Sequence, residues 1–416
     1  MARTLTPQDA HALMTSLVHQ ATGQTGIIVT DTSSFVSAGE TVLSTGVENT
    51  LNALGIVLGR TFMAVRPYKA RLRILNAINT GEYTSRLRKI SFYSRDPQAA
   101  GDWNTDLFTN LKDGYDNGSN GGKSTASMWE QNAPVPLEVN FAGQNVWNDS
   151  TTVYENQLKV AFRDENEFLD FIAGIMTEKG NDIESQKEAF NQMTLLNKMA
   201  AVYDTSADAP GSVINLTELY NQQFGTLYTS QQLRTEYLQS FLEFFVSEFK
   251  TASRMLSHRS AKFHLSPTKT IDGTNYTLLR HTPADRQRAI LYSPLFIKAE
   301  AMVYPQIFHE DYLKLDEQHE LVDYWQAIDA GASINITPAV YDKTTGLQKA
   351  GESVSLDYVV GALYDVDSVM TDFQFEDALS TPVEARKRYH NIWYHFSKNA
   401  INDPTENFIL FIMKDA

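Results

Sequence analysis

The distribution of apolar residues near the end of the chain predicts two different strands. Six consecutive apolar residues, Phe408 to Met413, follow Asn407. This pattern predicts a strand buried on both faces, which other elements must cover. Just upstream, residues 388–396 are rich in aromatic side chains and predict a second strand.

Helical spacing dominates the middle of the chain. Carboxylates after Asp164 open a helical pattern, which Gly180-Asn181 is expected to interrupt, and a second helix is predicted over 182–203. Further helices are predicted over 216–224, 232–256 and 299–310. The inward faces of the helices at 182–203 and 232–256 are predicted to carry Ile183, Phe190, Met193, Leu196 and Ala200, and Tyr237, Phe241, Phe244, Phe245 and Phe249.

The segment 79–161 is read as a long hairpin that projects from the body. Two strand-like runs, Arg86 to Ser94 and Leu137 to Phe141, flank a stretch rich in Gly, Asn, Asp and Ser. A loop of that length is expected to be functional or to reach another chain. Short strands are also predicted at 276–279, 289–292, 333–336 and 359–363, with a linker at 204–212. The class is therefore α+β.

Composition is that of a globular protein large enough for more than one folding unit. The chain has 416 residues, of which 42% are hydrophobic and 20% charged, and it has no cysteine. The missing thiols exclude disulfides and thiolate catalysis, and suit assembly in a reducing cytoplasm. Neither a signal peptide nor a membrane-spanning segment is indicated.

Charge is unevenly distributed around a formal net charge of −15. Nine basic residues and one acid, Glu82, lie between Arg60 and Arg95. Seventeen acids and three lysines lie between Glu300 and Ala385. The chain therefore carries a basic segment that could face nucleic acid or an acidic protein surface.

The candidate motifs for chemistry are weak. Gly121-Gly-Lys-Ser124 resembles half of a phosphate-binding loop, but Asn117 stands where that motif needs glycine. His390 and His395 point to opposite faces of a strand and cannot easily share a metal. The carboxylates Asp365, Asp367, Asp372, Glu376 and Asp377 are interpreted as a hydrated acidic surface. No catalytic residue, cofactor or metal is predicted, so the protein is not expected to be an enzyme.

The end of the chain resembles the closing segment of tailed-bacteriophage major capsid proteins of the Hong Kong 97-type fold. The matching features are Thr381-Pro382, the run Tyr-x-Asn-x-Trp-Tyr-His from Tyr389, and the terminal apolar strand. Three further segments resemble coat proteins of short-tailed phages: Arg280-His-Thr-Pro-Ala, Ser333-Ile-Asn-Ile-Thr-Pro338 and Gly361-Ala-Leu-Tyr-Asp-Val-Asp367.

The resemblance implies a division of the chain into five parts. These are an N-terminal arm (1–78), an extended hairpin called the E-loop (79–161), a peripheral domain with a long spine helix (162–212), an axial domain with an acidic insertion (213–386), and terminal strands that return to the peripheral domain (387–416). The implied function is a virion coat protein that self-assembles into pentamers and hexamers of an icosahedral head around double-stranded DNA.

In this fold the E-loop lies across a neighbouring subunit. Its basic residues are therefore expected to meet acidic residues of the next copy's spine helix, with the packaged DNA as the competing partner of the basic segment. The candidate contact residues are Arg86, Arg88, Lys89 and Arg95 on one side and, on the other, either Asp182, Glu184 and Glu188 or the acidic residues from Asp164 to Asp170.

Other partners follow from the same resemblance. A separate scaffolding protein and a portal are expected, non-specific contact with DNA is expected, and a membrane partner is not. Some relatives join a lysine to an asparagine covalently. Lys89, Lys112 and Lys123, with Asn399 and Asn402, offer the groups, but no local motif marks a cross-link. The alternatives are an encapsulin-type shell protein or a soluble hydrolase that uses paired carboxylates between 300 and 377.

Overall fold

A computed structural model describes most of the chain. The described residues are 7–23, 26–45, 53, 75–78, 86–94, 133–142, 145–154, 165–271, 274–297, 319–342, 345–382, 384 and 386–415. The predicted helix at 299–310, the glycine-rich part of the E-loop, and residues 60–74 of the basic segment lie outside these ranges. Within the described residues no helix is long and apolar enough to cross a bilayer.

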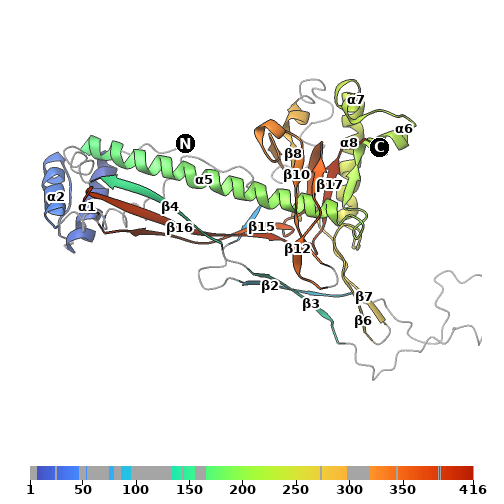
Figure 1. The fold of residues 1–416 in the computed structure, drawn as a ribbon, viewed down its shortest axis with the longest axis horizontal. Coiled ribbons are helices and arrows are strands. Elements are labelled where there is room, and N and C mark those ends of the chain that lie inside the picture. Colours follow the sequence, from blue (N-terminus) through green and yellow to red (C-terminus); the bar gives the residue numbers. More distant parts are fainter. Residues whose placement is uncertain are drawn as a thin grey trace, which may run out of the picture.

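A single helix, α5 (Glu165–Asp204), runs along most of the molecule (Figure 1). Its 40 residues make it about 60 Å long. The predicted interruption at Gly180-Asn181 is wrong, because one helical glycine costs only about 1 kcal/mol relative to alanine and α5 packs along β15 (Val369–Ser380) and β16 (Tyr389–Asn402). The predicted inward face is correct except at Met193, which is 53% exposed.

A four-stranded sheet lies beside α5, in the order β1-β15-β16-β4. β1 (Asn76–Ile78) and β4 (Asn145–Tyr154) form its edges. The predicted aromatic strand is confirmed as the first part of β16, where burial alternates from Tyr389 to Tyr394. β4 falls within the predicted E-loop, so the projecting part of the chain is shorter than 79–161.

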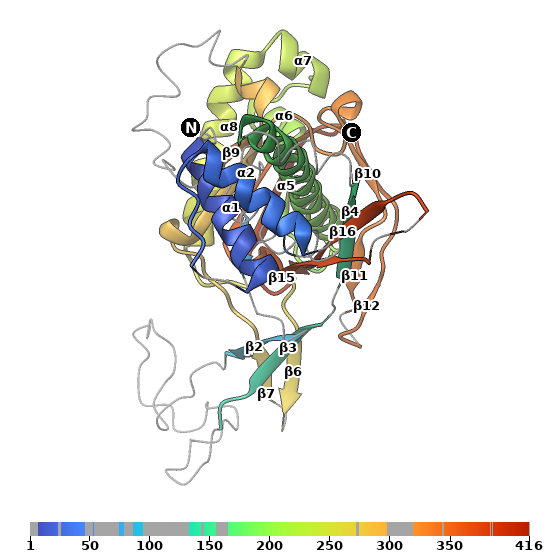
Figure 2. The same cartoon turned by 90° about the vertical axis from the view of Figure 1, so that its left-hand side faces the viewer.

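Two helices that the sequence analysis did not predict, α1 (Pro7–Thr22) and α2 (Thr32–Ser44), pack together and close the far end of α5 (Figure 2). α2 begins with a capping box in which the Asp31 carboxylate accepts from the Ser34 amide at 2.7 Å. This Asp-x-x-Ser signal was available in the sequence.

The second body is a five-stranded sheet in the order β5-β17-β14-β8-β9. Its strands are β5 (Val213–Asn215), β17 (Phe408–Ile412), β14 (Val359–Asp365), β8 (Gln287–Tyr292) and β9 (His319–Val322). All five residues of β17 are buried, as predicted. α8 (Leu238–Leu256) covers one face through Phe245 and Phe249 against Phe411, while residues near the end of α5 cover the other.

The helices beside this sheet differ from prediction in one respect. α6 (Leu216–Phe224) matches its predicted bounds. The predicted helix at 232–256 is divided into α7 (Ser230–Thr235) and α8, because Tyr237 leaves helical geometry with φ −111° and ψ 26°. The aromatic stripe on α8 is core, as expected.

The two terminal strands separate, whereas the sequence analysis placed both in the peripheral domain. β16 lies along α5, but β17 enters the five-stranded sheet. The reason is the burial that each pattern demands. An alternating strand needs cover on one face, whereas a continuous apolar strand needs it on both, and the five-stranded sheet provides that.

The predicted hairpin is confirmed at its base, where β2 (Arg86–Phe92) pairs antiparallel with β3 (Pro136–Ala142). A second hairpin, β6 (Thr268–Ile271) and β7 (Thr274–Thr277), lies beside it and is joined to it by the bridge Ser94–Thr277. Both project from the body (Figures 1 and 2). The remaining short elements are β10 (Ile334–Ile336) with β13 (Val354–Leu356), β11 (Ala339–Tyr341) with β12 (Gln348–Ala350), and the 3₁₀ turns Ala284–Arg286 and Ile328–Ala330.

Candidate functional site at the base of the hairpin

The projecting hairpin meets both bodies at residues 403–407, which connect β16 to β17 and are named the junction loop. Its backbone is tied to its surroundings: the Asp403 amide donates to the Ser368 carbonyl at 3.0 Å, and the Leu265 amide donates to the Pro404 carbonyl at 2.9 Å. Asp403 and Asn407 are fully buried. The position of the junction loop is therefore fixed relative to the two sheets that it connects.

β2 divides its side chains between two faces because successive residues of a strand alternate. Leu87, Lys89 and Ser91 face the body, whereas Arg88 and Ile90 face outward. The Lys89 ammonium forms ion pairs with Asp403 and with Glu406 of its own chain. Lys89 thus holds the base of the hairpin on the junction loop.

The pKa values of the two carboxylates of the junction loop shift in opposite directions, although burial favours a higher pKa for both. Burial alone would raise the pKa of Asp403, but the Lys89 ammonium and the hydrogen bonds from Thr405 outweigh it and hold that pKa below its usual value. The Thr405 hydroxyl and amide donate to the same Asp403 oxygen at 2.7 and 2.8 Å. Burial raises the pKa of Glu406 despite its neighbours Lys89 and Arg280.

Arg280 provides a second tie between the hairpin and the junction loop. Its guanidinium donates to the Ser91 hydroxyl at 2.6 Å and to the Thr405 carbonyl at 3.2 Å, and it lies 3.4 Å from the Glu406 carboxylate. Lys89 and Ser91 of β2 are therefore both bound to one network of Arg280 and the junction-loop carboxylates, which fixes the hairpin's direction.

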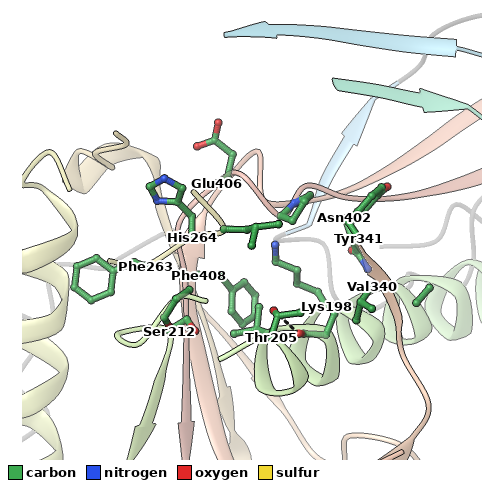
Figure 3. Close-up of a pocket in the computed structure, with 16 residues that line it drawn as sticks. Lys198, Thr205, Ser212, Phe263, His264, Val340, Tyr341, Asn402, Glu406 and Phe408 are labelled. Carbon is green, nitrogen blue, oxygen red and sulfur yellow. Dashed lines mark hydrogen bonds between the residues drawn. The ribbon is translucent and has the colours of Figure 1, made fainter. Parts of the chain in front are cut away.

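α5 contributes Lys198, which reaches the junction loop from the opposite side (Figure 3). Its buried ammonium donates to the Asp403 carbonyl at 2.6 Å, and burial lowers the pKa of Lys198 to about 8. Beside it is a cavity of about 40 Å³ between Phe263, Tyr341 and Phe408. A cavity of that size admits a few water molecules rather than an organic substrate.

Asp365 and Asp372 do not belong to the hydrated acidic surface predicted from the sequence, whereas the Asp367 side chain is 38% exposed and those of Glu376 and Asp377 lie outside the described part of the structure. Asp365 is buried and accepts from the Thr282 hydroxyl at 2.9 Å and from Arg286 at 3.1 Å. Arg286 also pairs with Asp367, and Asp372 is buried. In the described part of the chain, no three His, Asp or Glu side chains are grouped so that they could hold a metal ion.

The predicted contact residues occupy several environments. Lys89 is half-buried in the junction, whereas the Arg88 side chain is 58% exposed and pairs with Glu138 at 2.9 Å. On α5, Asp182 is exposed, 3.6 Å from Lys179, and Glu184 is buried, 3.7 Å from Lys187. The remaining three are Glu188, which is half-buried on α5, Arg86, whose backbone is described in β2, and Arg95, which lies outside the described residues.

Sequence reasoning missed the residues that form the junction. Asp403, Glu406, Lys198 and Arg280 are far apart in the sequence, and Lys198 lies within a helical pattern that predicts core. One signal was present: Asp403-Pro-Thr-Glu-Asn407 separates two strands and is too polar to continue either.

Comparison with known proteins gives a family. The family model of Phi29-like phage major capsid proteins matches residues 101–412. No curated protein sequence matches significantly. Solved structures that resemble the chain include the capsid of Staphylococcus phage Andhra, with 10% identity, 83% of this chain and 84% of that chain covered, and a TM-score of 0.51.

Two other solved structures show lower similarity. A chain from the structure of the head fiber and inner core protein gp22 of native bacteriophage P68 has 13% identity, covers 83% and 85% of the two chains, and gives a TM-score of 0.48. The capsid of Cyanophage P-SCSP1u has 8% identity, covers 84% of this chain and 90% of that chain, and gives a TM-score of 0.43. Because the family model matches well over half of the chain, this chain belongs to the Phi29-like phage major capsid proteins, has a Hong Kong 97-type fold, and is a coat protein of a phage capsid.

Proposed function

We propose that this coat protein assembles into pentameric and hexameric rings of an icosahedral head around double-stranded DNA, and that its hairpin reaches a neighbouring copy. In this proposal the four-stranded sheet and α5 form the peripheral domain, and the five-stranded sheet with α6 to α8 forms the axial domain. The comparisons do not favour the encapsulin or the hydrolase alternative.

The observation that carries the proposal is the outward face of β2. Ile90 and Phe92 are 51% and 58% exposed and alternate with the inward residues that clamp the hairpin. A strand that is fixed on one face and apolar and basic on the other is suited to bury that outer face against another chain. The contacts of Lys89 and Ser91 with the body fix the direction of the hairpin, which lowers the conformational entropy that is lost when it binds another chain.

Charge is proposed to guide this contact. Arg88, with Arg86 and Arg95, would meet Asp182 and Glu188 of the next copy; Glu184 is excluded because it is buried in its own chain. Since Lys89 already neutralises carboxylates of its own chain, the proposal relies on the arginines. Rim charges of this kind mainly affect encounter and register and are screened by salt.

The test is the double variant Arg86→Glu and Arg88→Glu. We expect fewer particles than wild type at low salt and a smaller difference at high salt, measured by light scattering and negative-stain electron microscopy. Lys269→Glu, an exposed lysine on the neighbouring β6, is the matched control. Asp182→Lys added to the double variant should restore part of the yield. Equal particle yields for wild type and the double variant at every salt concentration would refute the contact.

Further partners are proposed from the same function. A separate scaffolding protein and a portal would direct assembly in the bacterial cytoplasm, and the basic residues between 60 and 73, which the contact with the next copy does not use, would touch packaged DNA through phosphates. Expression of the chain alone and with its neighbouring genes tests this. Shells or rings are expected, and a monodisperse monomer or dimer in both cases would overturn the proposed function.

A further inference from the structure

The turn between α6 and α7, residues 224–228, has a rigid backbone. α6 ends at Gly225 in the left-handed region, with φ 65°. The Asn221 side chain donates to the Tyr228 carbonyl at 2.9 Å and accepts from the Tyr228 amide at 3.0 Å and from the Thr226 hydroxyl at 2.8 Å. The Tyr228 ring stacks on Tyr237 at 4.1 Å. The turn is therefore held in one shape.

This rigid turn displays two apolar side chains. Leu227 is 95% exposed and Phe224 is 52% exposed. The Phe224 ring packs against the rings of Tyr220 and Phe244, with ring centres 4.6 Å and 6.1 Å away, so its position is fixed. A single exposed leucine is ordinary, but two exposed apolar side chains three residues apart on a preorganised turn form a knob suited to insertion into another surface.

A cleft of about 410 Å³ lies beside α7, at the end of β8. Tyr292, Pro294, Leu295 and Tyr358 form its apolar walls, and Arg234 lies over the Tyr358 ring with its guanidinium carbon 3.9 Å from the ring centre. In Figure 1, α6 lies on one side of α8 and β8 on the other. The knob precedes α7, whereas Gln231, Arg234 and Thr235 of α7 line the cleft, so the knob and the cleft are formed by different residues.

We propose that Leu227 and Phe224 of one copy insert into this cleft on the next copy around a capsomer ring, an inference that rests on the proposed function. Two different surfaces that meet head to tail generate a ring when the rotation closes, whereas a two-fold contact would pair a surface with itself. The charges are complementary: Glu218 is the one charged residue between 216 and 229, and Arg234 is the one charged side chain among the described residues that line the cleft.

The absence of cysteine from the chain makes a direct test possible. Leu227→Cys and Thr235→Cys, the second at an exposed position on the cleft wall, are prepared in separately tagged chains and co-assembled. Each chain then has one thiol, so a disulfide between the two tags reports contact between copies. Disulfides require β-carbons about 4 Å apart. We expect a mixed dimer on a non-reducing gel of oxidised particles.

The control pairs Leu227→Cys with Met255→Cys, which lies on the separate groove between α6 and α8. A mixed dimer with Met255→Cys but not with Thr235→Cys would overturn the cleft assignment. Particles that give neither product would overturn it as well, while leaving the proposed function intact. If the wild-type chain forms neither rings nor shells, both proposals fail.

A second variant measures the contribution of the knob. Leu227→Asp should lower the yield of rings at least tenfold while leaving the melting temperature of the unassembled chain unchanged, because Leu227 is almost fully exposed in a single copy. Wild-type yields from this variant would overturn the proposal.

Discussion

Replacing Lys89 with methionine tests whether the buried charges of the junction loop hold the hairpin in place. The change keeps most of the side-chain length and removes the ammonium from two carboxylates, Asp403 and Glu406. Breaking a buried ion pair by removing one partner costs about 3–5 kcal/mol. The wild-type side chain is 22% exposed, so water can partly replace it.

The remaining partners reduce this cost. Asp403 keeps two hydrogen bonds from Thr405, and Glu406 keeps Arg280 at 3.4 Å. We therefore expect Lys89→Met to lower the free energy of unfolding by about 2–3 kcal/mol at pH 7. Urea unfolding of the unassembled chain measures this, and amide hydrogen exchange of residues 86–92 shows whether the hairpin is the part released.

The matched control is Arg88→Met on the same strand. Its ion pair with Glu138 is exposed at both ends, so its loss should cost no more than about 0.5 kcal/mol. If Lys89→Met lowers the free energy of unfolding no more than this control does and leaves hydrogen exchange of the β2 amides unchanged, then Lys89 does not hold the hairpin on the junction loop.

Acidification gives a further check on the same variant. Because the pKa of Asp403 is held below its unfolded value, its stabilising contribution is present above that value and is lost as the pH falls through the folded-state pKa. In Lys89→Met, protonation at low pH removes the charge of the Asp403 carboxylate, which has lost its lysine partner. The difference between variant and wild type should therefore be largest near neutral pH and shrink below about pH 4.

Two other predictions concern the buried lysine Lys198 and a pair of glycines. Burial lowers the pKa of Lys198 to about 8, so above that pH the unfolded chain binds more protons than the folded chain. The free energy of unfolding of the wild type should therefore rise by roughly 2 kcal/mol from pH 7 to 9.5 through this residue. In urea titrations, Lys198→Met should remove this part of the pH dependence and leave the part due to Lys398, whose pKa burial also lowers to about 8. Gly361→Ala places a β-carbon 2.4 Å from the Ile290 carbonyl oxygen in the middle of the five-stranded sheet and should cost at least about 3 kcal/mol or prevent folding. Gly346→Ala has open space but a φ of 68°, and should cost about 1–2 kcal/mol in thermal unfolding; similar losses at both glycines would contradict the packing argument.

The sequence determined the parts of this protein whose burial follows from local periodicity. The continuous apolar run at 408–413 predicted a strand covered on both faces, and the 3.6-residue spacing predicted α6, α8 and most of the second half of α5. The paired runs that became β2 and β3 predicted a hairpin. In each case neighbouring residues carry the signal, because a helix or strand exposes its faces at a fixed period.

The tertiary structure decided where these elements go and which charges meet. Nothing near Gly180 indicates that packing against β15 and β16 carries one helix through it. Nothing near Lys89 distinguishes a rim charge from the half-buried cation that neutralises Asp403 and Glu406, more than 300 residues away along the chain. Both ion pairs and two-sided burial depend on three-dimensional neighbours from distant segments. Apolar strands gain free energy by leaving water together, whereas buried charges lose their hydration and are stable only where opposite charges or hydrogen bonds compensate them.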